Sequence, residues 1–116
     1  ICPGGMPGAK NLGDCTALVQ MIQKHFDKSG YVAAICAAPA LVLSKIEMNK
    51  RYTMTCYPGF EEYLPGAEIQ PHGVVVDGNV ITGRGPAYAF KFGLAILEQL
   101  TSKKVAEEVA AGMLLD

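Results

Sequence analysis

The fold is decided by one stretch, Ala33-Ala34-Ile35-Cys36-Ala37-Ala38-Pro39. It continues an apolar run, Tyr31 to Ile35, that shows no polar alternation, which is typical of a parallel strand covered on both faces. Pro39 suits the first turn of a helix, because its missing N–H has no partner there, and we expect Ala40 to Ile46 to be helical. The order strand, Cys36, helix places Cys36 at the carboxyl end of a buried strand.

Before this stretch, the sequence predicts a turn and an amphipathic helix. Ile1-Cys2 resembles the end of a buried strand that runs into the turn Pro3-Gly4-Gly5. Because strands usually have five or six residues, we expect sequence upstream of Ile1 to belong to this fold. Asp14 is a candidate cap and Gly30 a candidate stop for a helix whose apolar positions recur at helical spacing: Leu18, Met21, Ile22 and Phe26.

After the stretch, strands and helices continue to alternate. The pattern predicts a strand at Tyr52 to Thr55, an irregular connection at Tyr57 to Gly66, and a hairpin from Val74 to Ile81 that turns at Asp77-Gly78. Pro86 to Leu100 is almost entirely apolar, with Lys91 and Glu98 on one stripe, so we expect a helix buried on most sides. A last amphipathic helix covers Val105 to Met113. The sequence therefore predicts an α/β sandwich with a mostly parallel sheet.

Composition limits the protein to a few classes. The 116 residues suit a single domain, 1–116, and a net charge of -1 argues against a nucleic-acid partner. The longest apolar run, Val32 to Leu43, is broken by Pro39, so we expect no membrane span. Four cysteines without a C-x-x-C pair and two distant histidines predict no metal site and favour free thiols in a reducing, cytoplasmic environment.

Cys36 is the candidate nucleophile. A strained turn between a strand and a helix lifts a side chain above the sheet and directs helix N–H groups at it, which stabilises a thiolate. The alternative is that Cys36 is a small buried apolar residue, as many free cysteines are. We assign this structural role to Cys2, Cys15 and Cys56, with Cys56 as the next candidate for reactivity.

Two glycine-rich loops could accompany Cys36. Pro3-Gly4-Gly5 offers backbone N–H groups to an oxyanion or phosphate, or it is only a tight turn; no nucleotide-binding motif is present. In Gly83-Arg84-Gly85-Pro86, Arg84 either holds a carboxylate or is a solvated loop arginine. The residues alone leave both alternatives open.

Three motifs follow one another along the chain: Cys2-Pro3-Gly4-Gly5, Ala33 to Pro39 and Thr82 to Pro86. Together and in this order they resemble the ThiJ/PfpI superfamily, specifically its parkinsonism-associated protein deglycase branch. The resemblance implies a flavodoxin-like three-layer sandwich, a homodimer, no cofactor, and a reactive cysteine at Cys36. It also implies that the chain is the C-terminal two-thirds of the family fold, without the N-terminal strands and helix.

The resemblance assigns further roles near Cys36. The N–H groups of Gly5 and Ala37 would hold an oxyanion, and the substrate site would include Gly4, Tyr57, Arg84 and Pro86. The family's acid is a glutamate in a segment that this chain does not contain, and Glu61 and Glu62 do not stand at its position.

Two departures from the family pattern concern histidines. Ala37 stands where the protease-like branch has a histidine, which disfavours peptidase activity. Tyr57 stands where the deglycase branch has one, and a tyrosine hydroxyl is protonated at neutral pH and cannot act as a base.

The resemblance implies a glyoxalase or deglycase that acts on methylglyoxal, a small aldehyde, or on its adducts. The alternative is an oxidative-stress sensor or chaperone in which Cys36 becomes a sulfinic acid. A third interpretation is a protein linked to thiamine or thiazole synthesis by family name alone. The first two differ in turnover, because a catalyst consumes aldehyde repeatedly and a sensor reacts once per thiol.

Overall fold

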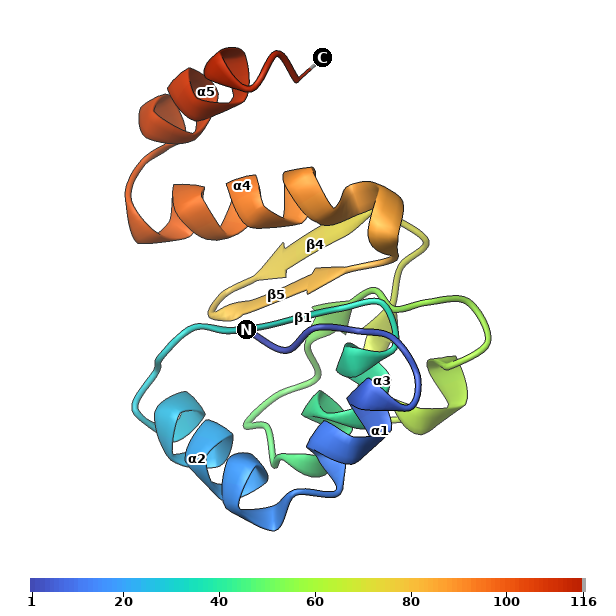
Figure 1. Cartoon of the computed structure of the whole chain (residues 1–116). Coiled ribbons are helices and arrows are strands. Elements are labelled where there is room, and N and C mark those ends of the chain that lie inside the picture. Colours follow the sequence, from blue (N-terminus) through green and yellow to red (C-terminus); the bar gives the residue numbers. More distant parts are fainter. Residues whose placement is uncertain (116) are drawn as a thin grey trace.

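The computed structural model describes residues 1–115 and has a three-layer α/β arrangement (Figure 1). The central sheet has the strand order β1-β5-β4, with β1 at Val32–Ile35, β5 at Val80–Gly83 and β4 at Val74–Asp77. Helices lie on both faces of the sheet. The α/β fold class predicted from the sequence is confirmed.

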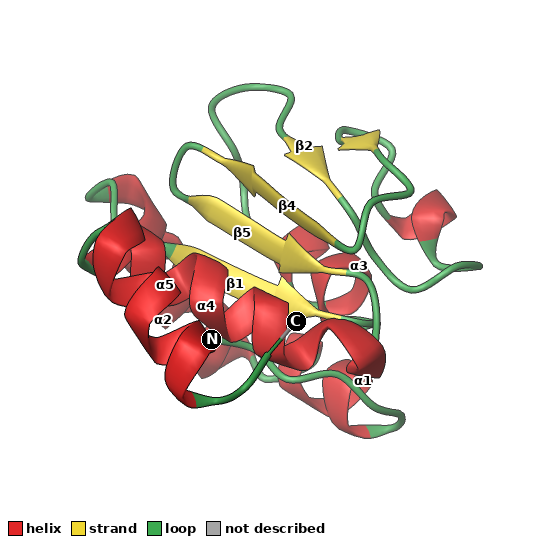
Figure 2. Cartoon of the chain, turned by 90° about the horizontal axis from the view of Figure 1, so that it is seen from above, coloured by secondary structure: helices red, strands yellow, loops and turns green. Residues whose placement is uncertain are grey.

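The sheet is mixed. β1 and β5 pair in parallel, with Val32 opposite Val80 and Ile35 opposite Gly83, whereas β4 and β5 form an antiparallel hairpin. Cys2 extends the sheet on the other side of β1 through a parallel bridge to Ala34. Figure 2 shows the three strands side by side, with β2 (Thr53–Met54) beyond them; β2 pairs in parallel with β3 (Glu68–Ile69).

The helices divide between the two faces. Figure 1 shows α1 (Gly8–Gly13), α2 (Thr16–Asp27) and α3 (Ala38–Leu41) on one side, and α4 (Ala89–Leu100) on the other with α5 (Lys103–Gly112) packed outside it. Short 3₁₀ turns cover Leu43–Lys45, Glu61–Tyr63 and Pro86–Tyr88.

Alternation along the strands builds a separate core on each face. Successive side chains of a strand point to opposite sides of the sheet. Val32, Ala34 and Val80 accordingly join the larger core with α1, α2 and α3. Ala33 and Ile81 pack against Phe92 of α4. The wholly apolar β1 is thus covered on both faces, as its sequence predicted.

The N-terminal helices differ from the prediction. Residues 8–13 form α1, a helix that the sequence did not predict because it begins and ends with glycine. Asp14 lies at the end of this helix and does not cap the next one. Asp14 accepts a hydrogen bond from Lys10, four residues earlier, at 2.7 Å. The N-cap of α2 is Cys15. The predicted cap was wrong because the carboxylate is paired with a lysine on the preceding helix.

Two further helices also depart from the prediction. The helix expected at Ala40 to Ile46 is interrupted, since α3 ends at Leu41 and a 3₁₀ turn follows. In α4 only Phe92 is buried, and Phe90 is 63% exposed, so burial on most sides was wrong. The sheet and α5 each cover only part of α4, which leaves Phe90 in contact with solvent.

No helix within residues 1–115 is long and apolar enough to cross a membrane.

Candidate functional site at the Cys36 turn

Cys36 occupies a strained turn at the carboxyl end of β1. Its φ is +67°, in the left-handed region that residues with a Cβ rarely adopt. The Cys36 N–H donates to the Gly83 carbonyl at 2.8 Å, and the Cys36 carbonyl accepts from the Tyr57 N–H at 2.8 Å. Two hydrogen bonds to distant segments therefore hold the strained turn between β1 and α3.

The Pro3-Gly4-Gly5 loop lies directly against this turn. A Cβ on Gly4 would stand 2.5 Å from Cys36 Cβ, 2.8 Å from the Ile35 carbonyl oxygen and 3.4 Å from Cys36 Sγ. Gly5 has a φ of +86°. The loop can approach the cysteine only because Gly4 has no side chain, so the structure brings the first two sequence motifs together.

The backbone on either side of Cys36 presents free donors. Among the described residues, neither the Gly5 N–H nor the Ala37 N–H donates to a protein acceptor. Ala37 is buried and immediately precedes α3, while Gly5 is exposed. Unpaired N–H groups beside a nucleophile can hold a developing oxyanion.

Tyr57 and Pro86 border the turn on the side of the third motif. Tyr57 is 45% exposed, and its ring lies 3.7 Å from where a Cβ on Gly85 would stand. The ring also meets Phe60 edge-to-face, with 6.4 Å between centroids. Pro86 is exposed at the start of its 3₁₀ turn.

Arg84 is fixed by its backbone more than by its side chain. Its N–H donates to the Gly73 carbonyl at 2.9 Å, and Nη1 reaches the Pro71 carbonyl only at 3.4 Å. Arg84 lines a small cavity together with Cys56 and Glu61. Sequence reasoning did not place Glu61 near Arg84, and no spacing signal links the two residues.

The four thiols are free and differ in environment. Burial raises the pKa of Cys56 to about 11, with a smaller contribution from the Glu61 carboxylate. Burial also raises the pKa of Cys2. Both thiols are therefore protonated and shielded at neutral pH. Cys36 is partly exposed and Cys15 is exposed, so these two are the accessible thiols.

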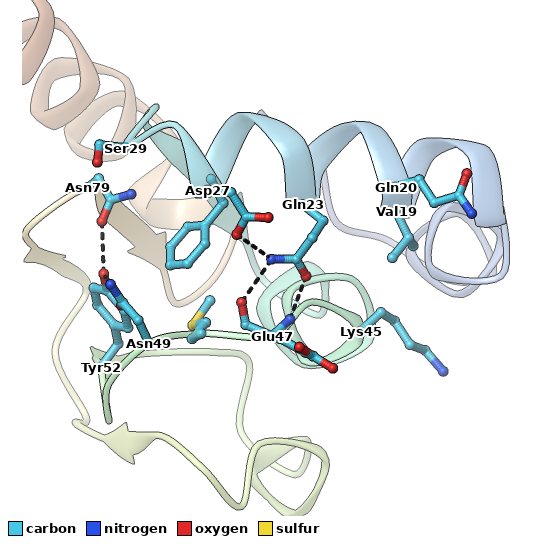
Figure 3. A pocket seen from close by; sticks show the side chains of 12 residues that line it. Val19, Gln20, Gln23, Asp27, Ser29, Lys45, Glu47, Asn49, Tyr52 and Asn79 are labelled. Atoms are coloured by element: carbon cyan, nitrogen blue, oxygen red, sulfur yellow. Dashed lines mark hydrogen bonds between the residues drawn. The ribbon is translucent and has the colours of Figure 1, made fainter.

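A larger cavity lies at the opposite edge of the sheet, where the strands begin (Figure 3). It measures about 820 Å³. Its polar groups mainly bond to one another or to the backbone: Gln23 donates to the Glu47 carbonyl at 3.0 Å and accepts from the Glu47 N–H at 2.6 Å. Tyr52 Oη donates to Asn79 Oδ1 at 3.0 Å. We interpret this network as structural, because it joins α2 to the segment before β2.

The amino-acid sequence of the chain is similar to those of known proteins. Residues 1–99 match the DJ-1/PfpI family. The chain is 35% identical to the "Parkinson disease protein 7 homolog" of Danio rerio over 118 residues, which cover 99% of this chain and 62% of that protein.

Solved structures agree with the sequence match. The crystal structure of Drosophila melanogaster DJ-1beta gives a TM-score of 0.89 at 35% identity, with 97% of this chain and 61% of that one covered. Oxidized Toxoplasma gondii DJ-1 gives 0.87 at 34% identity, with the same coverage of each chain. The chain thus spans about 60% of the length of these relatives.

Proposed function

The chain belongs to the DJ-1/PfpI family, and on that premise we propose a cysteine-dependent, cofactor-independent glyoxalase or deglycase that acts on methylglyoxal or its adducts. The observation that carries the proposal is the strained Cys36, at φ +67°, between Gly4 and Ala37. The flavodoxin-like fold shared with these relatives positions the cysteine at the carboxyl edge of the sheet.

The chemistry follows from the groups around Cys36. The thiolate attacks the aldehyde carbon, a C–S bond forms, and the carbonyl electron pair moves to oxygen. The Gly5 and Ala37 N–H groups stabilise this oxyanion, and a protonated acid then supplies the proton that completes a hemithioacetal. The hemithioacetal then isomerises to a lactoyl thioester, as one proton moves from C1 to C2 and another from the C1 hydroxyl to the C2 oxygen. Attack of water on this thioester breaks the C–S bond, releases lactate and restores the thiol.

The remaining features of the proposal come from the resemblance. The substrate is a small aldehyde, the complete protein is a cytoplasmic homodimer, and the acid is a glutamate outside residues 1–116. Tyr57 offers a hydrogen-bond donor where related proteins have histidine, and its exposure leaves the hydroxyl free to reach a substrate.

A second candidate function is an oxidative-stress sensor or chaperone. It is favoured by the accessibility of Cys36 beside two shielded thiols, Cys2 and Cys56. The Cys36 thiolate would attack one oxygen of hydrogen peroxide, which breaks the O–O bond, gives a sulfenic acid and releases hydroxide. A second peroxide would oxidise the sulfenic acid to the sulfinic acid with release of water.

Thiol labelling tests the role of Cys36. In the full-length protein at pH ~6, iodoacetamide should modify Cys36 before Cys2, Cys15 or Cys56, as peptide mapping would show. Peroxide should add two oxygens at Cys36 first, and a Cys36→Ser variant should lose this early oxidation in intact-mass analysis. Earlier labelling of Cys15, the other accessible thiol, would remove the assignment.

Turnover separates the two functions. Wild-type protein and a Cys15→Ser control should consume many equivalents of methylglyoxal per thiol, and Cys36→Ser should consume none. Consumption that stops at one equivalent per Cys36 would reject the enzyme and leave the sensor.

A further inference from the structure

A small cavity next to the Cys36 turn carries two opposite charges. It measures about 160 Å³, and its lining includes Cys56, Glu61, Gln70 and Arg84. Cys56 connects it to the nucleophile, because the next residue, Tyr57, donates its N–H to the Cys36 carbonyl at 2.8 Å. The cavity therefore adjoins the proposed reaction site.

The two charges are not paired with each other. Within residues 1–115, the ion pairs are Lys10–Asp14, Lys50–Asp77 and Lys103–Glu107, so Glu61 and Arg84 lie more than 4.0 Å apart. Arg84 Nη1 makes one long contact, 3.4 Å, with the Pro71 carbonyl. One oxygen of Glu61 accepts from the Gly59 N–H. Most donors of the guanidinium and the second Glu61 oxygen remain available.

Both charges act on the same thiol. The Glu61 carboxylate raises the pKa of Cys56, and the Arg84 guanidinium opposes it. The Cys56 thiol itself remains uncharged at neutral pH, since burial keeps it protonated. The cavity thus has a cationic side, an anionic side and an uncharged wall, and Gln70 adds an amide.

This arrangement selects for a dipolar ligand. A guanidinium pairs with a carboxylate through two parallel hydrogen bonds, and a carboxylate pairs with an ammonium group. Glu61 is exposed and Arg84 is half-buried, and a ligand with only one charge would pair with only one of these two side chains. The volume is below the ~300 Å³ of ordinary ligand pockets, which suits a small head group and excludes a folded chain.

We propose that this cavity binds the ammonium and carboxylate groups of a free α-amino acid, with Arg84 holding the carboxylate and Glu61 the ammonium. The inference rests on the proposed function in one respect: it names the substrate class as a methylglyoxal adduct on the side chain of a free amino acid. The sequence leaves Arg84 as either a residue that holds a carboxylate or a solvated loop arginine. The role of Glu61 as the partner of an ammonium group comes from the structure alone.

Calorimetric titration with L-alanine tests the cavity without any turnover. The experiment uses the full-length protein with Cys36→Ser, so that a failure of the proposed chemistry cannot affect the result. L-Alanine should bind at least 10-fold more tightly than acetate or ethylamine, because each of these probes carries one of its two charges. An affinity for L-alanine that is no higher than the affinity for acetate or for ethylamine would overturn the proposal. An absence of any measurable L-alanine binding would also overturn it.

Matched variants identify the residues. Glu61→Gln and Arg84→Gln should each weaken alanine binding about 10-fold, whereas Glu62→Gln, the adjacent carboxylate outside the cavity lining, should leave it unchanged. If Arg84→Gln lowers the melting temperature, Arg84→Lys retains the charge and should bind alanine more tightly than Arg84→Gln. A loss of binding in Glu62→Gln equal to that in Glu61→Gln would reject the assignment.

Discussion

The two edges of the sheet differ in whether their polar groups have hydrogen-bond partners within the chain. At the edge where the strands begin, Tyr52 Oη donates to Asn79 Oδ1 (Figure 3), and Asp77 accepts from the Thr53 N–H. At the edge where they end, the Gly5 and Ala37 N–H groups have no acceptor within residues 1–115, and Cys36 adopts a strained backbone conformation. Both edges are built by the same strands, so the difference comes from the connecting loops.

The comparison separates stability from chemistry. Satisfied hydrogen bonds contribute to the free energy of unfolding, and unpaired donors and strain reduce it. Substitutions at the strand-start edge should therefore lower stability without changing thiol reactivity. Substitutions at the strand-end edge should alter thiol reactivity, with or without a change in stability.

The largest effect is expected at Gly4. Gly4→Ala places a Cβ against Cys36 Cβ and the Ile35 carbonyl oxygen, neither of which is a flexible side-chain end. We expect the free energy of unfolding to fall by about 3 kcal/mol in urea denaturation, and iodoacetamide labelling of Cys36 to slow. Gly8→Ala is the control, because no atom lies within 4 Å of the added Cβ, and a similar loss there would contradict the close-approach argument.

Tyr52→Phe tests the strand-start edge. It removes the hydroxyl that donates to Asn79 and Asn49 and leaves their amide oxygens without this donor. The free energy of unfolding should fall by about 1 to 2 kcal/mol, and the labelling rate of Cys36 should stay unchanged. Tyr31→Phe, at an exposed position, should change neither quantity. A slower labelling rate in Tyr52→Phe would show that the two edges are coupled.

Backbone strain at Cys36 is tested by comparing two variants. Cys36→Gly should be more stable than Cys36→Ala by about 1 kcal/mol, because glycine adopts a φ of +67° without steric cost. At Ala17, inside α2, replacing alanine with glycine should instead lower stability by a similar amount. If Cys36→Gly is the less stable of the two Cys36 variants in thermal melts, the turn is not strained.

The smallest effect concerns Asp77 and depends on pH. The Lys50 ammonium and the Thr53 N–H lower the pKa of Asp77 below its ordinary value. A lowered folded-state pKa gives a stabilisation that is complete above the unfolded value, near 4, and is lost as the pH falls through the folded value. Asp77→Asn should therefore cost less than ~1 kcal/mol at pH 7 and nothing at the lowest pH values. Urea denaturation from pH 7 down to the lowest pH values should show that the free energies of unfolding of the wild type and Asp77→Asn converge. A difference that stays constant with pH would show that the Asp77 charge does not contribute to stability.

Much of the fold could be predicted because local patterns determine it. The apolar run before Cys36 predicted a strand covered on both faces, and Asp77-Gly78 predicted the hairpin of β4 and β5. Both signals are contained within a few residues. The strand predicted at Tyr52 to Thr55 contains β2, whereas β3 and the glycine-containing α1 have weaker patterns, since tertiary contacts and not periodicity form them.

The candidate site could be predicted only in part. The order strand, cysteine, helix predicts a strained turn at Cys36, and the structure has a positive φ there. The proximity of Glu61 to Arg84 could not be predicted, because it depends on how the connection after Tyr57 returns to the sheet. The exposure of α4 also depends on long-range packing.

The parallel pairing of β1 with β5 also determines when the site can form during biosynthesis. The Cys36 N–H requires the Gly83 carbonyl, and a ribosome adds about 5 to 20 residues per second, so several seconds separate the synthesis of these two residues. During this interval the thiol belongs to an unfolded nascent chain and reacts as an ordinary cysteine. The strained turn at Cys36 can therefore form only after Gly83 has been synthesised and has emerged from the ribosome.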